Sequence, residues 1–153
     1  MIRKATEHDI PRIIDLLHQV DMVHFRCRPD IFKPDTTKYN SLQLRQILAD
    51  ESQLVFVYED ECVLGYAIGQ VEDVRNDVLL QDMRSLYIDD ICVDESARGR
   101  HIGTALFNFV RNYAKSIGCE MLTLNVWEGN DSAMAFYRSL GMKTRKTCME
   151  IQL

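Results

Sequence analysis

Residues 93–104 read Val-Asp-Glu-Ser-Ala-Arg-Gly-Arg-His-Ile-Gly-Thr and join an apolar run to a helical pattern. Gly99 and Gly103 remove side chains where the oxygens of a ligand would have to approach the backbone. Arg98 and Arg100 add positive charge to the same turn. Because the N-terminus of a helix favours anions, a strand, a Gly/Arg-rich turn and a helix in this order predict a phosphate-binding cradle.

Length and composition indicate one soluble globular domain covering residues 1–153. Of the 153 residues, 46% are hydrophobic and 27% charged, which is ordinary for such a domain. The net charge of −5 argues against nucleic-acid binding and suits a cationic substrate. The first residues are charged and no apolar run is long enough to span a membrane, so we expect no membrane partner.

The cysteines and histidines show no metal-binding or disulfide pattern. The five cysteines are widely spaced without a Cys-x-x-Cys pair, which predicts reduced thiols and a cytoplasmic protein. The four histidines lack the i, i+4 spacing of a helical metal pair. We therefore expect no metal.

Hydrophobic periodicity predicts a single mixed α/β domain without internal repeats. The expected order is β-α-α-β-β-β-α-β-α-β, with a polar hairpin loop over residues 72–82. Strands are expected at residues 2–5, 54–58, 63–71, 85–93 and 121–127, with one or two closing strands within 142–153. Helices are expected from residue 10 to about 23, around residues 42–48, over 102–117 and over 130–139.

Two motifs in this element order resemble the GNAT superfamily of N-acetyltransferases, which use acetyl-CoA. The family signature Arg/Gln-x-x-Gly-x-Gly/Ala stands here as Arg98-Gly-Arg-His-Ile-Gly103, with His101 in the place of the usual middle glycine. A second block, Asn-x-x-Ala-x-x-Phe-Tyr-x-x-x-Gly-Phe, matches residues 130–142 except for Met142 at its last position. The resemblance implies an α/β (α+β) fold, with a central mixed, mostly antiparallel sheet flanked by about four helices.

The same resemblance implies acetyl-CoA as cosubstrate. Backbone groups of residues 99–104 would hold the pyrophosphate, and the strand before the turn would pair with the pantetheine arm. Asn130 would contact the same arm, which is compatible with a role as helix N-cap. If the position of His101 needs a positive φ, the histidine has a steric cost that glycine avoids. The implied cofactor residues are Ile91, Cys92, Val93, Arg98, Gly99, Arg100, His101, Ile102, Gly103, Thr104 and Asn130.

Tyr137 is the catalytic candidate in the second block. A Phe-Tyr pair on a helix commonly serves packing alone. Acetyl transfer from a thioester, however, expels a thiolate, and a positioned phenol can protonate it as the charge develops. The family places its general acid at this tyrosine, so the resemblance implies that role for Tyr137.

Asp89 and Asp90 are adjacent in the strand that leads into the turn. Because neighbouring strand residues face opposite sides, we expect only one of them to line a cleft. The string Tyr-Ile-Asp-Asp is similar to Tyr-Leu-Glu-Asp of the polyamine acetyltransferase branch, whose first acid lies at the acceptor site. That similarity points to Asp89 as base, directly or through a water, and leaves Asp90 as a substrate candidate. A structural ion pair or a carboxylate in a strand bulge is the alternative.

The acceptor is less defined than the cofactor. The family places acceptor residues between the first two helices, which makes Phe25, Arg28 and Phe32 candidates. The acidic balance favours a small-molecule cationic amine, while a protein N-terminus or a lysine side chain remains open. The resemblance implies direct transfer without a cysteine intermediate, and homodimers are common in the family. A non-catalytic acetyl-CoA sensor is the alternative from another class.

Overall fold

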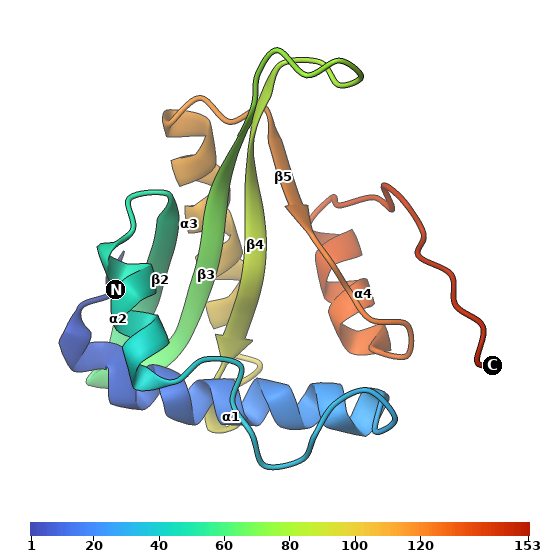
Figure 1. Ribbon diagram of the computed structural model, residues 1–153. Helices are drawn as coiled ribbons and strands as arrows, with labels where there is room; N and C mark the ends of the chain where they lie inside the picture. The colour runs from blue at the N-terminus through green and yellow to red at the C-terminus, as the bar shows by residue number, and fades with distance from the viewer.

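The computed structural model describes residues 1–153 as a five-stranded sheet with helices on both faces (Figure 1). The strands follow one another in the sheet in the order β1-β2-β3-β4-β5. The first four pair antiparallel and β5 runs parallel to β4, so the sheet is mixed and mostly antiparallel, as predicted. The strands are β1 (Ile2–Lys4), β2 (Gln53–Asp60), β3 (Cys62–Val74), β4 (Met83–Val93) and β5 (Met121–Leu124).

Four helices cover this sheet, again as predicted. In Figure 1, α1 (Ile10–Cys27) and α2 (Ser41–Ala49) lie on one face and α3 (Ile102–Ser116) on the other, while α4 (Asp131–Ser139) lies beside β5. Two short 3-10 turns, η1 (Glu7–Asp9) and η2 (Glu95–Ala97), precede α1 and α3. Each face of the sheet buries its own apolar cluster, one against α3 and the other against α1 and α2. No helix is long and apolar enough to cross a membrane.

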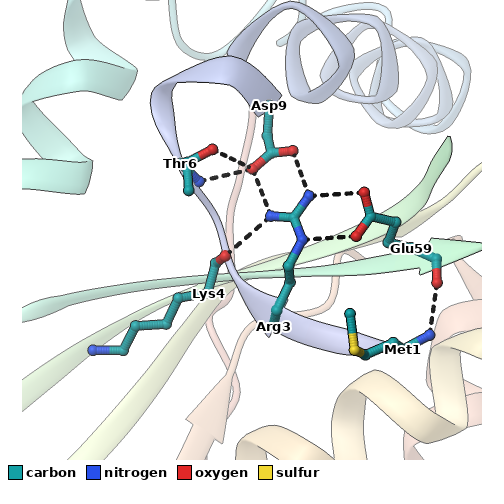
Figure 2. Close-up of polar contacts among 6 residues, drawn as sticks. All are labelled: Met1, Arg3, Lys4, Thr6, Asp9 and Glu59. Carbon is teal, nitrogen blue, oxygen red and sulfur yellow. Dashed lines mark hydrogen bonds and ion pairs between the residues drawn. The ribbon is translucent and has the colours of Figure 1, made fainter.

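Arg3 ties the edge of the sheet to the start of α1 (Figure 2). Its guanidinium donates to both carboxylate oxygens of Asp9, at 2.8 and 2.9 Å, and to Glu59 on β2 at 2.8 and 3.1 Å. Asp9 also accepts from the Thr6 backbone N–H and hydroxyl, which closes a capping box. The bonds to Arg3 are the main reason why the pKa of Asp9 falls to about 2. This ionic contact therefore fixes where α1 leaves the sheet.

The second half of β4 is free along one edge. Pairing with β5 covers only Ser85 to Ile88, whereas β4 continues to Val93. A register shift lies at the same point on the other side of β4, where Ile68 pairs with Asp90 but the next β3 residue pairs with Ile88. Asp89 is therefore the extra residue of a β-bulge, and a bulge bends its strand and increases the local twist. The sheet opens between β4 and β5 beyond this bulge.

The structure corrects two expectations for the chain outside the core. Strands β3 and β4 run further than predicted, to Val74 and from Met83, so the hairpin loop is shorter than residues 72–82. The closing strands expected within residues 142–153 are absent, and residues 143–153 form no backbone–backbone hydrogen bond. Alternating side chains give a segment strand propensity, but a strand forms only where a second strand pairs with it.

Candidate active site

The turn before α3 presents a row of free backbone donors. None of the N–H groups of residues 99–104 has an acceptor within the protein, and the helix ladder starts with Ala105 donating to the His101 carbonyl. Gly99 takes φ +80°, a conformation that glycine adopts without steric strain. These donors, at the positive end of the 15-residue helix α3, form an anion site.

His101 adopts the strained backbone that its position in the motif suggested. It is the N-cap of α3 and lies in the left-handed region, at φ +60° and ψ +16°. A non-glycine residue held there costs on the order of 1 kcal/mol, which the packing of α3 must offset. The histidine therefore keeps the turn that the family's glycine makes, with a ring added beside the donors.

A cleft of about 440 Å³ opens at this turn and brings together the end of β4, the start of α3 and one face of α4. All predicted cofactor residues except Arg100 line it. The Arg100 side chain instead donates to Asp60 at 2.8 Å and is not part of the cleft wall. The lining residues are Val20, Val23, Ile91, Cys92, Val93, Ala97, Arg98, Gly99, His101, Ile102, Gly103, Thr104, Asn130, Ser132, Ala133, Phe136 and Tyr137.

Helix α4 forms the far wall of the cleft. Asn130 caps it, accepting at 3.3 Å from the Ala133 backbone N–H. Gly103 of α3 permits close contact between the two helices, because a Cβ there would lie 3.3 Å from the Phe136 ring. The Tyr137 ring packs near Phe107 and Phe136, while its hydroxyl has no hydrogen-bond partner within the protein. Burial raises the pKa of Tyr137 well above 10, so its phenol stays protonated.

Cys92 lies in the same cleft but is chemically quiet. Its side chain is buried and its thiol donates to the Leu16 carbonyl at 3.3 Å. Burial raises the pKa of the Cys92 thiol to about 12. Because the thiolate is the reactive form of cysteine, this residue is a poor nucleophile at neutral pH.

The bulge turns both Asp89 and Asp90 toward the α1/α2 face of the sheet. Asp89 accepts from the Tyr39 hydroxyl and from Lys38 Nζ, both at 2.7 Å. Asp90 accepts at 2.7 Å from the hydroxyl of Tyr66, which belongs to the apolar cluster on that face. We expected neighbouring strand residues to face opposite sides, so that only one of the two would line a cleft. The extra residue of the bulge shifts the alternation by one position, and neither carboxylate is among the residues that line the cleft at the turn.

Asp90 is the carboxyl group whose pKa the fold raises toward neutrality. Burial raises the pKa of Asp90 to about 6, against the opposing effects of Tyr66, Lys38 and His24. Asp21 on α1 adds a third acid nearby, and it accepts at 2.7 Å from the Lys38 backbone N–H. No sequence pattern indicated the residues that surround the aspartates, because they come from α1, from the loop before α2 and from β3 with no fixed spacing between these segments. They are Asp21, Lys38, Tyr39 and Tyr66.

The three acceptor candidates, at the end of α1 and in the loop that follows it, are not among the residues that line the cleft. Phe32 stacks on His24 with ring centroids 5.3 Å apart and meets Trp127 edge-on at 5.2 Å. The Arg28 guanidinium lies 5.8 Å from the Trp127 ring centroid and forms ion pairs with Asp30 and Glu150. Phe25 is half-buried on α1. The aromatic and basic residues of this loop therefore gather around Trp127.

Known proteins of one family resemble this chain in sequence and in fold. The acetyltransferase (GNAT) family model matches residues 17–142. The chain belongs to the GNAT family. An uncharacterized N-acetyltransferase of Lactobacillus delbrueckii subsp. lactis is 32% identical to this chain. The matched segment covers 63% of this chain and 55% of that relative. A thialysine N-epsilon-acetyltransferase of Bos taurus is 29% identical over 92% of this chain and 82% of its own length.

Solved structures place the whole chain in the GNAT fold. A crystal structure of a mutant of the BH1408 protein from Bacillus halodurans superposes with a TM-score of 0.95 and is 33% identical, covering 100% of this chain and 99% of that one. An aminoglycoside acetyltransferase from an uncultured soil metagenomic sample has a TM-score of 0.75 at 20% identity, covering 100% and 94%. The second likeness concerns the fold alone.

Replacing Asp90 with asparagine should stabilise the protein in a pH-dependent way. With a folded-state pKa of about 6 against an ordinary 3.8, the folded protein binds this proton more tightly than the unfolded chain does. The resulting stability is complete below about pH 4 and is lost as the pH rises through 6. Asp90→Asn removes the buried charge and keeps an acceptor for Tyr66, so its free energy of unfolding should exceed that of the wild type by about 1–3 kcal/mol at pH 8. The difference should vanish near pH 4.

Chemical denaturation at several pH values measures this difference. Asp15→Asn, on an exposed part of α1, is the matched control and should show no such pH dependence. A wild type that is as stable as Asp90→Asn at pH 8 would contradict the raised pKa.

Proposed function

We propose that this protein transfers the acetyl group of acetyl-CoA directly to a primary amine. The observation that carries the proposal is that one cleft contains both a set of free backbone donors and a free phenol hydroxyl. At one end lie the free N–H groups of residues 99–104, and in the opposite wall Tyr137 presents a protonated hydroxyl without a partner. A thioester attached to a phosphate-bearing carrier needs both features.

The cofactor fits the cleft by charge and by backbone chemistry. The pyrophosphate would accept hydrogen bonds from the donors of the turn, with Arg98 contributing charge at the rim. The pantetheine arm carries amide groups and can pair with residues 91–93, where β4 has no neighbour on the β5 side. The acetyl end of the cofactor would then lie near the bulge.

The acceptor would approach from the α1/α2 face, where the two aspartates lie. Asp89 forms an ion pair with the primary ammonium group of Lys38, and the proposed acceptor carries a group of the same kind. Such an ammonium has an ordinary pKa near 10.4 and must lose a proton before it attacks. Asp89, directly or through a water, is the proposed base, and the charge of Asp90 helps to attract the cation. The thialysine acetyltransferase name of the bovine relative supports a small amine as acceptor.

The proposed reaction needs no covalent enzyme intermediate. The amine nitrogen forms a bond to the acetyl carbonyl carbon, and the carbon–sulfur bond of the thioester breaks. The ammonium first gives one proton to Asp89 or a water, and the neutral amine then attacks. Tyr137 donates its proton to the departing thiolate sulfur, and the second proton lost by the nitrogen restores the Tyr137 hydroxyl through water. The un-ionised thiol of Cys92 favours this direct route over transfer through cysteine. Holding the two reactants against each other near the bulge would supply much of the rate.

The arginines of the turn provide a matched test of the cofactor site. Arg98 lines the cleft, whereas Arg100 is paired with Asp60 outside it. Arg98→Ala should weaken CoA binding by roughly tenfold, the effect of one hydrogen bond to a charged group. Arg100→Ala should change it by no more than about twofold. Isothermal titration with CoA measures both, and an equal loss in the two variants would count against the proposed cradle.

Tyr137→Phe tests the reaction itself. Removing the proton donor should lower kcat by at least about 10²-fold, while the KM for acetyl-CoA stays within a few-fold because the ring still packs. Tyr113→Phe is the control, since this tyrosine packs on Phe56 away from the cleft. Rates are measured as CoA release with a panel of small amines and lysine peptides. Unchanged turnover in Tyr137→Phe would remove the proposed acid, and no wild-type turnover on any acceptor would favour a sensor.

Asp89→Asn separates acceptor binding from cofactor binding. Loss of the carboxylate charge should raise the KM for the amine by about tenfold or more and leave CoA affinity unchanged. Asp73→Asn removes a half-exposed carboxylate at the far end of β3 and should leave both constants as they are. If Asp89→Asn behaved like this control, Asp89 would not be the partner of the acceptor ammonium.

A further inference from the structure

Lys38 differs from the other lysines of the chain in that a carboxylate holds its ammonium group. Its Nζ donates to Asp89 at 2.7 Å, and no other lysine forms an ion pair. The Lys38 side chain is still 40% exposed, so a second reactant can reach its nitrogen. The contact lies at the bulge of β4, where the acetyl end of the cofactor would lie. A primary amine of the protein therefore occupies the place that the proposed acceptor would take.

The loop that carries Lys38 is anchored on both sides of this residue. The Lys38 backbone N–H donates to Asp21 on α1 at 2.7 Å, and the hydroxyl of the next residue, Tyr39, donates to Asp89 at 2.7 Å. Asn40 then caps α2, accepting from the Gln43 backbone N–H at 2.9 Å. In Figure 1 the loop from α1 to α2 runs back along α1, in line with the first of these contacts. An amine that is held in advance at a reaction site reacts faster than one that must bind from solution.

Asp90 links Lys38 electrostatically to the proposed acid. Burial raises the pKa of Tyr137 well above 10, and the charge of Asp90 adds to this rise. Burial also raises the pKa of Asp90, and the Lys38 ammonium opposes that rise together with the hydrogen bond from Tyr66. Because solvent and salt screen charges that lie far apart, such effects indicate groups that are near one another. Lys38 and Tyr137 are therefore both within electrostatic reach of the same carboxylate.

We propose that the protein acetylates its own Lys38 when acetyl-CoA is bound and no external amine is present. The inference rests on the proposed function, because it uses the same cofactor and the same acid. Asp89 or a water takes one proton from the Lys38 ammonium. The neutral nitrogen then bonds to the acetyl carbonyl carbon, the carbon–sulfur bond breaks, and Tyr137 donates its proton to the departing sulfur. The second proton lost by the nitrogen restores the Tyr137 hydroxyl through water, which leaves free CoA and an uncharged amide on Lys38.

Mass spectrometry after incubation with acetyl-CoA alone tests the proposal. The wild type should gain an acetyl group, and peptide mapping should place it on Lys38. Lys33 is an exposed lysine of the same loop without a paired carboxylate, so it reports direct chemical acetylation and should stay unmodified. Tyr137→Phe should lower the rate at Lys38 by at least about 10²-fold. Lys38→Arg keeps a cation beside Asp89 and should gain no acetyl group, because a guanidinium does not lose its proton.

The dependence on protein concentration separates transfer within one chain from transfer between two chains. Within one chain, the fraction of Lys38 that is acetylated in a given time should not change when the protein is diluted. Wild-type protein mixed with Tyr137→Phe should leave Lys38 of the variant unmodified. A rate that falls in proportion to dilution, or acetylation of the variant by the wild type, would overturn self-acetylation.

An external amine added to the same reaction separates this inference from the proposed function. CoA release with a small amine, together with a Lys38 that reacts no faster than Lys33, would overturn self-acetylation and leave the proposed function intact. If neither Lys38 nor any external amine were acetylated, both would be overturned. Acetylation of Lys38 that an external acceptor slows would support the inference, because the two amines then compete for Asp89.

Discussion

The β-bulge at Asp89 is the constraint from which the geometry of the site follows. One extra residue in β4, opposite Ile68 and Gly69, marks the point where β5 ceases to pair with β4. It frees the edge of β4 for a ligand, and it directs two successive carboxylates to one face of the sheet. A regular strand would separate Asp89 from Asp90 and keep the edge closed. The proposed cofactor and acceptor sites thus share a single origin in the backbone.

The cofactor side of the cleft is held in place by strain and close packing. His101 remains in a left-handed conformation because α3 is packed against the sheet and cannot move to relieve it. Gly103 brings α3 within contact of the Phe136 ring, which sets the position of Tyr137 one residue further along α4. The same contact between α3 and α4 therefore positions both the proposed acid, Tyr137, and the proposed phosphate cradle. The cleft is bounded by rigid elements, as a site that orients two reactants requires.

The proposed acceptor side contains two half-buried carboxylates, Asp89 and Asp90. Tyr39, Tyr66 and Lys38 satisfy the two aspartates, and burial keeps the proton affinity of Asp90 near neutrality. A carboxyl group with a pKa of about 6 can be charged or neutral under mild conditions, which makes the field at the acceptor responsive to pH. The ion pair of Arg28 with Glu150 places the C-terminal tail, residues 143–153, beside the loop that follows α1.

The sequence by itself determined most of the elements, the turn and the family, but not the pairing of the last residues. The patterns that led to these predictions are local and can be read without knowing how the chain packs. They are the helical periodicity of residues 102–117, the Gly/Arg turn and the block at residues 130–142. Tertiary structure alone decided the bulge, because a register shift depends on the partner strand and leaves no mark on a single strand's sequence. Tertiary structure also decided that the Arg100 side chain points away from the cleft, toward Asp60 at the end of β2. It likewise decided that Lys38, Tyr39 and Tyr66 donate hydrogen bonds to the two aspartates. The C-terminal tail shows the same division, since its alternation predicts a strand while only a pairing edge can make it one.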